Sequence, residues 1–146
     1  MLFRSWGIFQ KVKNLIIDNV KIPRRYNSIS YENCDKVIIK NLAYNDFNYD
    51  NSQEILKNIG ELYIENFNNE TAQRGLIIEN ITKLVLINSN IKFSSGTLPV
   101  NINKATKVEA RSLKVGTEVM DIKTSPNNSK YKIKIDDTGQ IGRAHV

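Results

Sequence analysis

The sequence predicts an all-β protein whose short coils stack into one solenoid of about five coils. One phrase, apolar–any–apolar–any–Asn, recurs along the chain at intervals of 22 to 25 residues. Each copy alternates with a period of two, which is typical of a strand with one buried face. A coil with one such strand cannot bury its apolar face alone, so we expect neighbouring coils to supply a shared core.

Aligned copies of the phrase place apolar residues in two columns, two positions apart. These predicted core columns are Leu15, Val37, Leu62, Leu84 and Val108, followed by Ile17, Ile39, Ile64, Leu86 and Ala110. A third column holds Asn19, Asn41, Asn66 and Asn88, with Ser112 in the fifth copy. Asparagine tolerates the left-handed backbone conformation and bonds to its own turn, and stacked asparagines can form a side-chain ladder. We therefore expect a turn at the end of every main strand.

Shorter apolar segments lie between the main strands. Residues 75–81 and 97–102 alternate as further strands, and residues 27–31 are a weaker candidate. The stretch 75–91 then consists of two strands that meet at a corner near Asn80. This pattern predicts a coil with more than one side.

Two phrases, Lys36–Leu42 and Gly75–Asn80, resemble the repeats of pectate-lyase-like proteins and phage tailspikes. The resemblance covers residues 12–115 and implies a single-stranded right-handed parallel β-helix. A leucine-rich-repeat solenoid is the alternative, because Ile81-x-x-Leu84-x-Leu86 fits its spacing. Against that alternative, the asparagine falls one position early and the intervals lack regular helical patterns.

Composition limits the classes of function. The net charge of +6 comes from cations interspersed with acids, so we expect no nucleic-acid partner. The single cysteine, Cys34, excludes an internal disulfide and stands at an apolar position of the repeat, where a buried thiol is expected. No apolar run reaches membrane-spanning length, so we expect no membrane insertion.

The two ends need separate treatment. Residues 1–11 are interpreted as a cap or a truncated start, and residues 116–140 as a further coil or the start of a following β module. Residues 141–146, Ile-Gly-Arg-Ala-His-Val, match the translation of a common sequencing adapter, ATCGGAAGAGCACACGTC. We interpret them as a probable artefact; they include the only histidine, His145.

A polar-aromatic stretch interrupts the repeat after residue 43. Its side chains suit a sugar, because aromatic faces stand beside carboxylates on a protruding loop; the other interpretation is that its aromatics pack back onto the core. The predicted ligand-binding residues are Tyr44, Asp46, Phe47, Tyr49 and Asp50. Asp46-x-Asn48-x-Asp50 lacks the glycine and glutamate of a calcium loop, so no metal site is predicted. Residues 52–58 are expected to form a single helical turn with Ser52 as N-cap.

The seventh position of the repeat forms one outward column. It contains Asp18, Lys40, Glu65, Ile87 and Arg111. One interpretation is a polar groove for a glycan, with Asp18 or Glu65 as acid or base. The favoured one is a ladder of surface ion pairs, each worth little, and interrupted by Ile87. The resemblance to pectin-cleaving enzymes implies clustered Asp with His or Arg, which is not found, so no catalytic residue is assigned. Asp137-Thr138-Gly139 is interpreted as a plain turn.

The sequence thus favours a non-catalytic structural or recognition solenoid, part of a larger surface or virion protein of tail-spike or adhesin type. The alternatives are a fragment of a β-helix polysaccharide lyase or glycoside hydrolase, and a leucine-rich-repeat interaction module. The expected partners are a cell-surface glycan or other virion or surface subunits, with a homo-oligomer possible. No cofactor is expected, and an extracellular, cell-surface or virion location is favoured.

Overall fold

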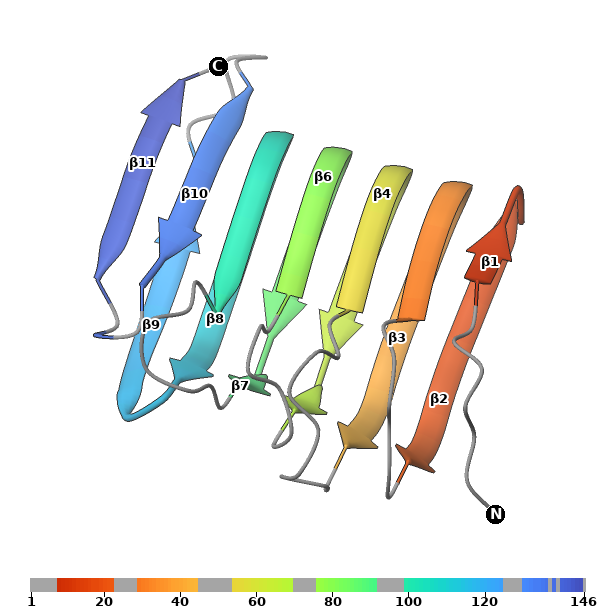
Figure 1. The fold of residues 1–146 in the computed structure, drawn as a ribbon, viewed down its shortest axis with the longest axis horizontal. Coiled ribbons are helices and arrows are strands. Elements are labelled where there is room, and N and C mark those ends of the chain that lie inside the picture. The colour runs from red at the N-terminus through yellow and green to blue at the C-terminus, as the bar shows by residue number, and fades with distance from the viewer. Residues whose placement is uncertain are drawn as a thin grey trace.

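A computed structural model describes residues 8–22, 29–44, 54–69, 76–91, 99–124, 130–136, 138 and 140–145. These residues form an 11-stranded sheet that winds into a solenoid, and they contain no helix. Figure 1 shows the long strands side by side, with the N-terminal strands at one end of the stack and the C-terminal strands at the other. The predicted all-β solenoid is confirmed.

Consecutive rungs of the stack are parallel and in register. The stacked strands are β2 (Asn14–Ile22), β3 (Ile29–Tyr44), β4 (Glu54–Glu65), β6 (Leu76–Ile87) and β8 (Val100–Val115). The short strands β1 (Ile8–Gln10), β5 (Asn68–Asn69) and β7 (Asn90–Ile91) continue the rungs around the coil. The stack amounts to about three turns, fewer than the expected five. The sequence repeat counts the stacked strands, whereas the first and last of these strands do not belong to complete turns in the described part of the chain.

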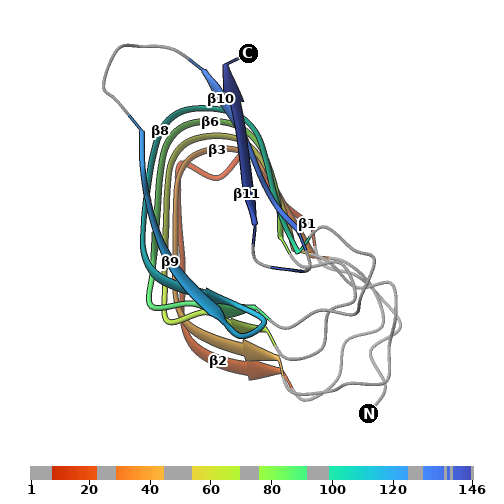
Figure 2. The same ribbon diagram turned by 90° about the vertical axis from the view of Figure 1, so that its left-hand side faces the viewer.

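Two corners bend every rung, and Figure 2 shows the resulting nested contours. At the first corner the left-handed residues are Lys11, Asn33, Asn58, Asn80 and Lys104. At the second they are Asn19, Asn41, Asn66, Asn88 and Ser112, the predicted asparagine column. The column of left-handed residues at the first corner was not predicted from the sequence. It explains why Leu76 and Leu84 lie on two sides of one coil, which meet at Asn80 as expected.

The segment 52–58 differs from its prediction. Glu54 to Asn58 are the first part of β4, paired with β3 on one side and with β6 on the other. Leu56 is fully buried, directly in register with Ile78. Pairing with two neighbouring strands outweighs the local helical preference of a short segment. Ser52 lies outside the described residues.

The core runs along the inside of the stack. Eight of the ten predicted core-column residues are at most 2% exposed, from Val37 to Ala110. Leu15 and Ile17 are half-buried, because they lie on the first rung and no rung covers them in the described part of the chain. Cys34 is buried among these side chains, and its thiol donates to the carbonyl of Glu32.

The C-terminal strands reverse the chain direction. After a turn at Gly116 (φ 62°), β9 (Glu118–Lys123) runs antiparallel to β8 along the second half of that rung. β10 (Tyr131–Ile135) runs antiparallel to the first half. The strands β9 and β10 therefore retrace the last rung and cover the end of the stack (Figure 1).

β11 (Ile141–His145) adds to the outer edge of β10 as an antiparallel strand. This segment was interpreted as an artefact from its sequence. Its residues Gly142, Arg143 and Ala144 are exposed, so the pairing relies mainly on backbone hydrogen bonds. Open strand edges accept extended segments of many sequences in this way.

Candidate binding face of the stacked sheet

The outward side chains between the two corners form a surface that we call the outer face. It has three columns, because outward residues alternate with core residues along each strand. The first column is Asn14, Lys36, Glu61, Lys83 and Lys107; the middle one is Ile16, Ile38, Tyr63, Val85 and Glu109; the third is Asp18, Lys40, Glu65, Ile87 and Arg111. The outer face thus has an apolar stripe with charged columns on both sides.

Ion pairs connect charged residues of neighbouring rungs. Lys36 Nζ lies 3.8 Å from Glu61 Oε2, and Lys40 Nζ lies 3.9 Å from Glu65 Oε2. The Lys40 ammonium also lies 5.6 Å from the centre of the Tyr63 ring. All four charged side chains are partly exposed, so each pair adds little to stability. Their main effect is to position charge around the apolar stripe.

A shallow depression of about 300 Å³ lies in the middle of the outer face. Tyr63, Ile38 and Val85 give it an apolar floor. Its full lining is Lys36, Ile38, Lys40, Glu61, Leu62, Tyr63, Lys83 and Val85. Three lysines against one glutamate make the lining net positive. A site with an apolar floor and a few charged groups at its margin is suited to bind a ligand with both apolar and anionic parts.

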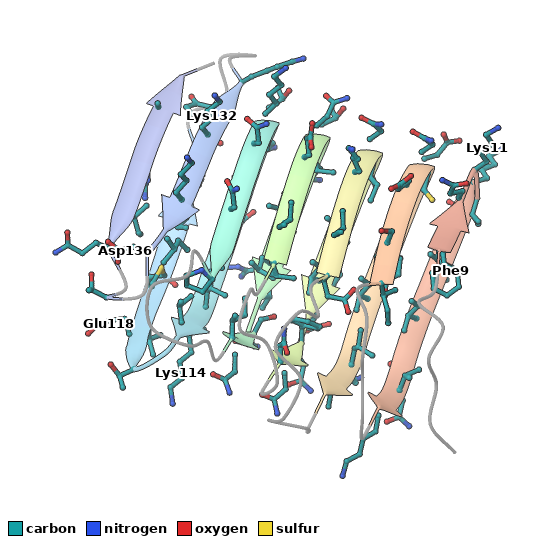
Figure 3. All side chains as sticks on the ribbon, viewed as in Figure 1. Phe9, Lys11, Lys114, Glu118, Lys132 and Asp136 are labelled. Carbon is teal, nitrogen blue, oxygen red and sulfur yellow. The ribbon has the colours of Figure 1, made fainter. Side chains whose placement is uncertain are left out.

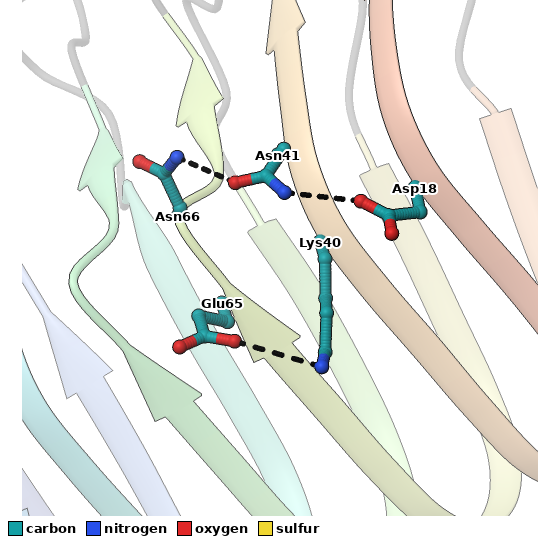
Figure 4. A network of polar contacts seen from close by, with 5 residues as sticks. All are labelled: Asp18, Lys40, Asn41, Glu65 and Asn66. Atoms are coloured by element: carbon teal, nitrogen blue, oxygen red, sulfur yellow. Dashed lines mark hydrogen bonds and ion pairs between the residues drawn. The ribbon is translucent and has the colours of Figure 1, made fainter.

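The second corner, beside the outer face, carries a ladder of amides (Figure 4). Asn66 Nδ2 donates to Asn41 Oδ1 at 2.7 Å, and Asn41 Nδ2 donates to Asp18 Oδ1 at 3.0 Å. The first corner has a similar ladder, with Asn58 donating to Asn33 and Asn80 donating to Asn58. These ladders fix the edges of the outer face from rung to rung.

The predicted outward column lies on the outer face, with one difference. Lys40 pairs with Glu65, and the Arg111 Nε atom lies 3.4 Å from Glu109 on its own strand. Ile87 is only 9% exposed, although it occupies an outward position. Its neighbours in register, Glu65 and Arg111, have long side chains that can cover it.

Most of the predicted ligand-binding residues lie outside the described part of the chain. Tyr44 is the last residue of β3, and its backbone pairs with Asn69. Asp46, Phe47, Tyr49 and Asp50 lie outside the described residues. Their assignment stays a prediction.

Two carboxylates on one strand of the outer face, Glu61 and Glu65, have a geometry unlike that of a hydrolase pair. Glu61 and Glu65 are four residues apart on one strand, or roughly 13 Å. Glycosidase carboxyl groups stand about 5 to 9.5 Å apart. Glu61 and Glu65 each pair with a lysine, as described above, and Asp18 accepts from Asn41. All three carboxylates thus have a partner on a neighbouring rung.

Two further observations concern the remaining ionisable groups. Within the described residues, no cluster of three or more His, Cys, Asp or Glu is arranged to hold a metal ion. In the turn before β11, Asp136 Oδ1 accepts three hydrogen bonds. They come from the Thr138 hydroxyl, the Gln140 backbone N–H and the Thr138 backbone N–H. These hydrogen bonds, the one from the Thr138 hydroxyl above all, lower the pKa of Asp136 below its usual 3.8. The predicted turn thus depends on Asp136; Asp137 and Gly139 lie outside the described residues.

Comparison with protein-family models, curated proteins and solved structures finds no match for this chain. The described part of the chain contains no helix that is long and apolar enough to cross a membrane.

The middle column, with Ile38, Tyr63 and Val85, was not singled out from the sequence. A signal for it exists. The main strands contain runs of three apolar residues, such as Val37-Ile38-Ile39 and Leu62-Tyr63-Ile64. In a strand with one buried face, the middle residue of such a run must point outward. An apolar stripe on an exposed sheet is more informative than a single exposed apolar residue.

Proposed function

We propose that this chain is a non-catalytic recognition segment of a larger surface or virion protein, of tail-spike or adhesin type, and that its outer face binds a glycan. The observation that carries the proposal is the depression over Tyr63, with lysines at its margin. The resemblance of the repeats to those of pectate-lyase-like proteins and phage tailspikes supports the same interpretation.

The chemistry of the outer face fits a sugar. A pyranose ring has an apolar face of C–H groups, which can pack on the Tyr63 ring and on the apolar stripe around it. Its hydroxyl groups can bond to Glu61 and to the lysines. Because Lys36, Lys40 and Lys83 outnumber Glu61, charge complementarity favours a glycan with carboxylate or other acidic groups.

The stack is suited to present such a face. The two amide ladders and the parallel pairing hold neighbouring rungs in register, at a spacing of about 4.8 Å. The outer face is therefore pre-organised, and little conformational entropy should be lost when a ligand binds.

Glycan-array binding by the whole chain tests the proposal. Tyr63→Ala should weaken binding to an acidic glycan at least about tenfold, because it removes the floor of the depression. Phe9→Ala is the matched control: Phe9 is an aromatic residue, 38% exposed and outside the outer face. It should leave binding unchanged. Absence of binding to every glycan would contradict the proposal.

The same array compares the outer face with the loop predicted from the sequence. If Tyr49→Ala abolishes binding and Tyr63→Ala does not, the ligand contacts the loop and the outer face is not the site. Cleavage of an acidic polysaccharide by the chain would instead favour the alternative function, a fragment of a polysaccharide lyase or glycoside hydrolase.

A further inference from the structure

The first rung, β1 and β2, carries most of the exposed large apolar side chains of the described residues, among them Phe9 on β1 (Figure 3). Among the described residues, the exposed large apolar side chains are Phe9, Ile16, Val20 and Val119. Three of these four belong to the first rung. Among the described strands β2 pairs only with β3, and none of them pairs with the backbone N–H and C=O groups of its other edge. Such an edge is a template for pairing with another strand.

The opposite end of the stack shows what an end rung of this solenoid can accept. There β9 lies antiparallel on β8, with Ile122 opposite Ala110 and buried. The last rung is thus covered by a strand of reversed direction whose apolar residues extend the core. An antiparallel strand is therefore compatible with the cross-section of this stack.

The flat part of β2 is self-complementary when it pairs antiparallel with a second copy of itself. If Ile16 faces Ile16 of the second copy, Leu15 faces Ile17 and Asn14 faces Asp18. Apolar residues then meet apolar residues on both sides of the sheet. The Asn14 amide can donate to the Asp18 carboxylate, which has a free oxygen lone pair besides the one that accepts from Asn41.

Other registers place apolar side chains opposite polar ones. A shift of one residue in each copy places Ile16 opposite Asp18, or opposite Asn14. The self-complementary register also lies wholly between the left-handed corners at Lys11 and Asn19, so no bend interrupts it.

We propose that β2 is a homodimer interface, in which two copies join end to end by antiparallel pairing around a two-fold axis at Ile16. The contact is isologous and closes after two copies. The two outer faces would become coplanar, and their apolar stripes would meet at Ile16. A ligand with repeated epitopes could then engage both copies, which raises the overall avidity. The proposal does not depend on glycan binding.

Analytical ultracentrifugation of the whole chain over a concentration series tests the interface. One paired strand is a small contact, so we expect twice the monomer mass at high concentration and dissociation on dilution. Ile16→Lys sets two ammonium groups opposite each other and should weaken dimerisation at least about tenfold.

Val119→Lys is the matched control. Val119 is 65% exposed and Ile16 66%, and Val119 lies on β9 at the other end of the stack. We expect this variant to dimerise like the unaltered chain. A chain that is monomeric at all concentrations would overturn the proposal, and so would assemblies larger than two copies or an equal loss in both variants.

Disulfide trapping tests the register. Antiparallel partners have Cα atoms about 4.5 to 5.5 Å apart, which is within disulfide range. Ile16→Cys should give a covalent dimer on mild oxidation, and Val119→Cys should not. Cys34 is 3% exposed and should not contribute. Failure of Ile16→Cys to cross-link, where the chain dimerises, would overturn the proposed register.

Discussion

Asn66 Nδ2 donates to Asn41 Oδ1 across 2.7 Å, and both residues have a left-handed backbone with φ of 53° (Figure 4). Left-handed geometry costs most residues about 1–2 kcal/mol, but asparagine visits it routinely. The same residue therefore makes the corner and connects it to the next rung. The repeat keeps asparagine here because both tasks fall on one position.

The first prediction separates these two tasks at Asn41. Asn41→Ala should lower the free energy of unfolding by about 1–3 kcal/mol, since alanine loses the ladder and strains the corner. Asn41→Gly loses the ladder but accommodates the corner, so we expect less than about 1 kcal/mol. Urea unfolding measures both. Asn14→Ala, at an exposed asparagine of ordinary strand geometry, is the control. Equal losses for alanine and glycine would show that strain is not the cause.

The second prediction concerns a close approach between two rungs. A Cβ atom on Gly60 would lie 2.7 Å from the backbone oxygen of Asp35. Because that oxygen belongs to the neighbouring rung, the chain must shift to admit a methyl group. Gly60→Ala should therefore destabilise the protein by about 1–3 kcal/mol.

Thermal and urea unfolding of Gly60→Ala can be compared with Gly142→Ala. At Gly142 the nearest atom to an added Cβ is 4.0 Å away, which is ordinary contact. The two variants make the same chemical change with and without a clash. If Gly142→Ala costs as much as Gly60→Ala, the distance to Asp35 does not decide the effect.

Much of the solenoid follows from the sequence, because the second-corner column is nearly uniform. Four asparagines and one serine mark the second corner of five rungs, and the residues before them alternate. The first corner is harder to predict, since Lys11 and Lys104 occupy it on the first and last rungs. At Ile55 and Leu56, only the pairing with β3 and β6 shows that the segment is a strand.

Strand direction could not be predicted at the C-terminal end. β9 and β10 alternate like the parallel strands, and an alternating pattern is the same in either direction. Nor does a pattern of apolar residues reveal how charges gather on the outer face. Lys36 and Lys40 lie on β3 and Lys83 lies on β6, and only the register brings these two rungs to one depression.

The third prediction concerns the side chain that joins the antiparallel end to the stack. Thr124 Oγ1 accepts from the Val108 amide at 2.9 Å and donates to the Val108 carbonyl at 3.4 Å. Both are buried. Thr124→Val keeps the shape but leaves the Val108 amide without this acceptor, so we expect a loss of about 1–3 kcal/mol.

Urea unfolding and amide hydrogen exchange check this result. In Thr124→Val the Val108 amide should exchange faster than in the unaltered chain. Thr106→Val, at a half-buried threonine of the same rung, is the control and should change stability little. Unchanged exchange at Val108 would show that the hydroxyl does not protect that amide.

The last prediction tests the alternation that defines core and outer face. Leu86 is 1% exposed, whereas its neighbour Val85 points outward beside Tyr63. Leu86→Asp should unfold the domain, because it buries a charge without a partner at a cost that is comparable to the whole stability. Ile39→Asp should do the same two rungs away. Val85→Asp should fold, since its carboxylate remains in contact with water and near Lys83.

Circular dichroism and urea unfolding measure all three variants. Cooperative folding of Leu86→Asp would refute its place in the core, and unfolding of Val85→Asp would refute the outer face.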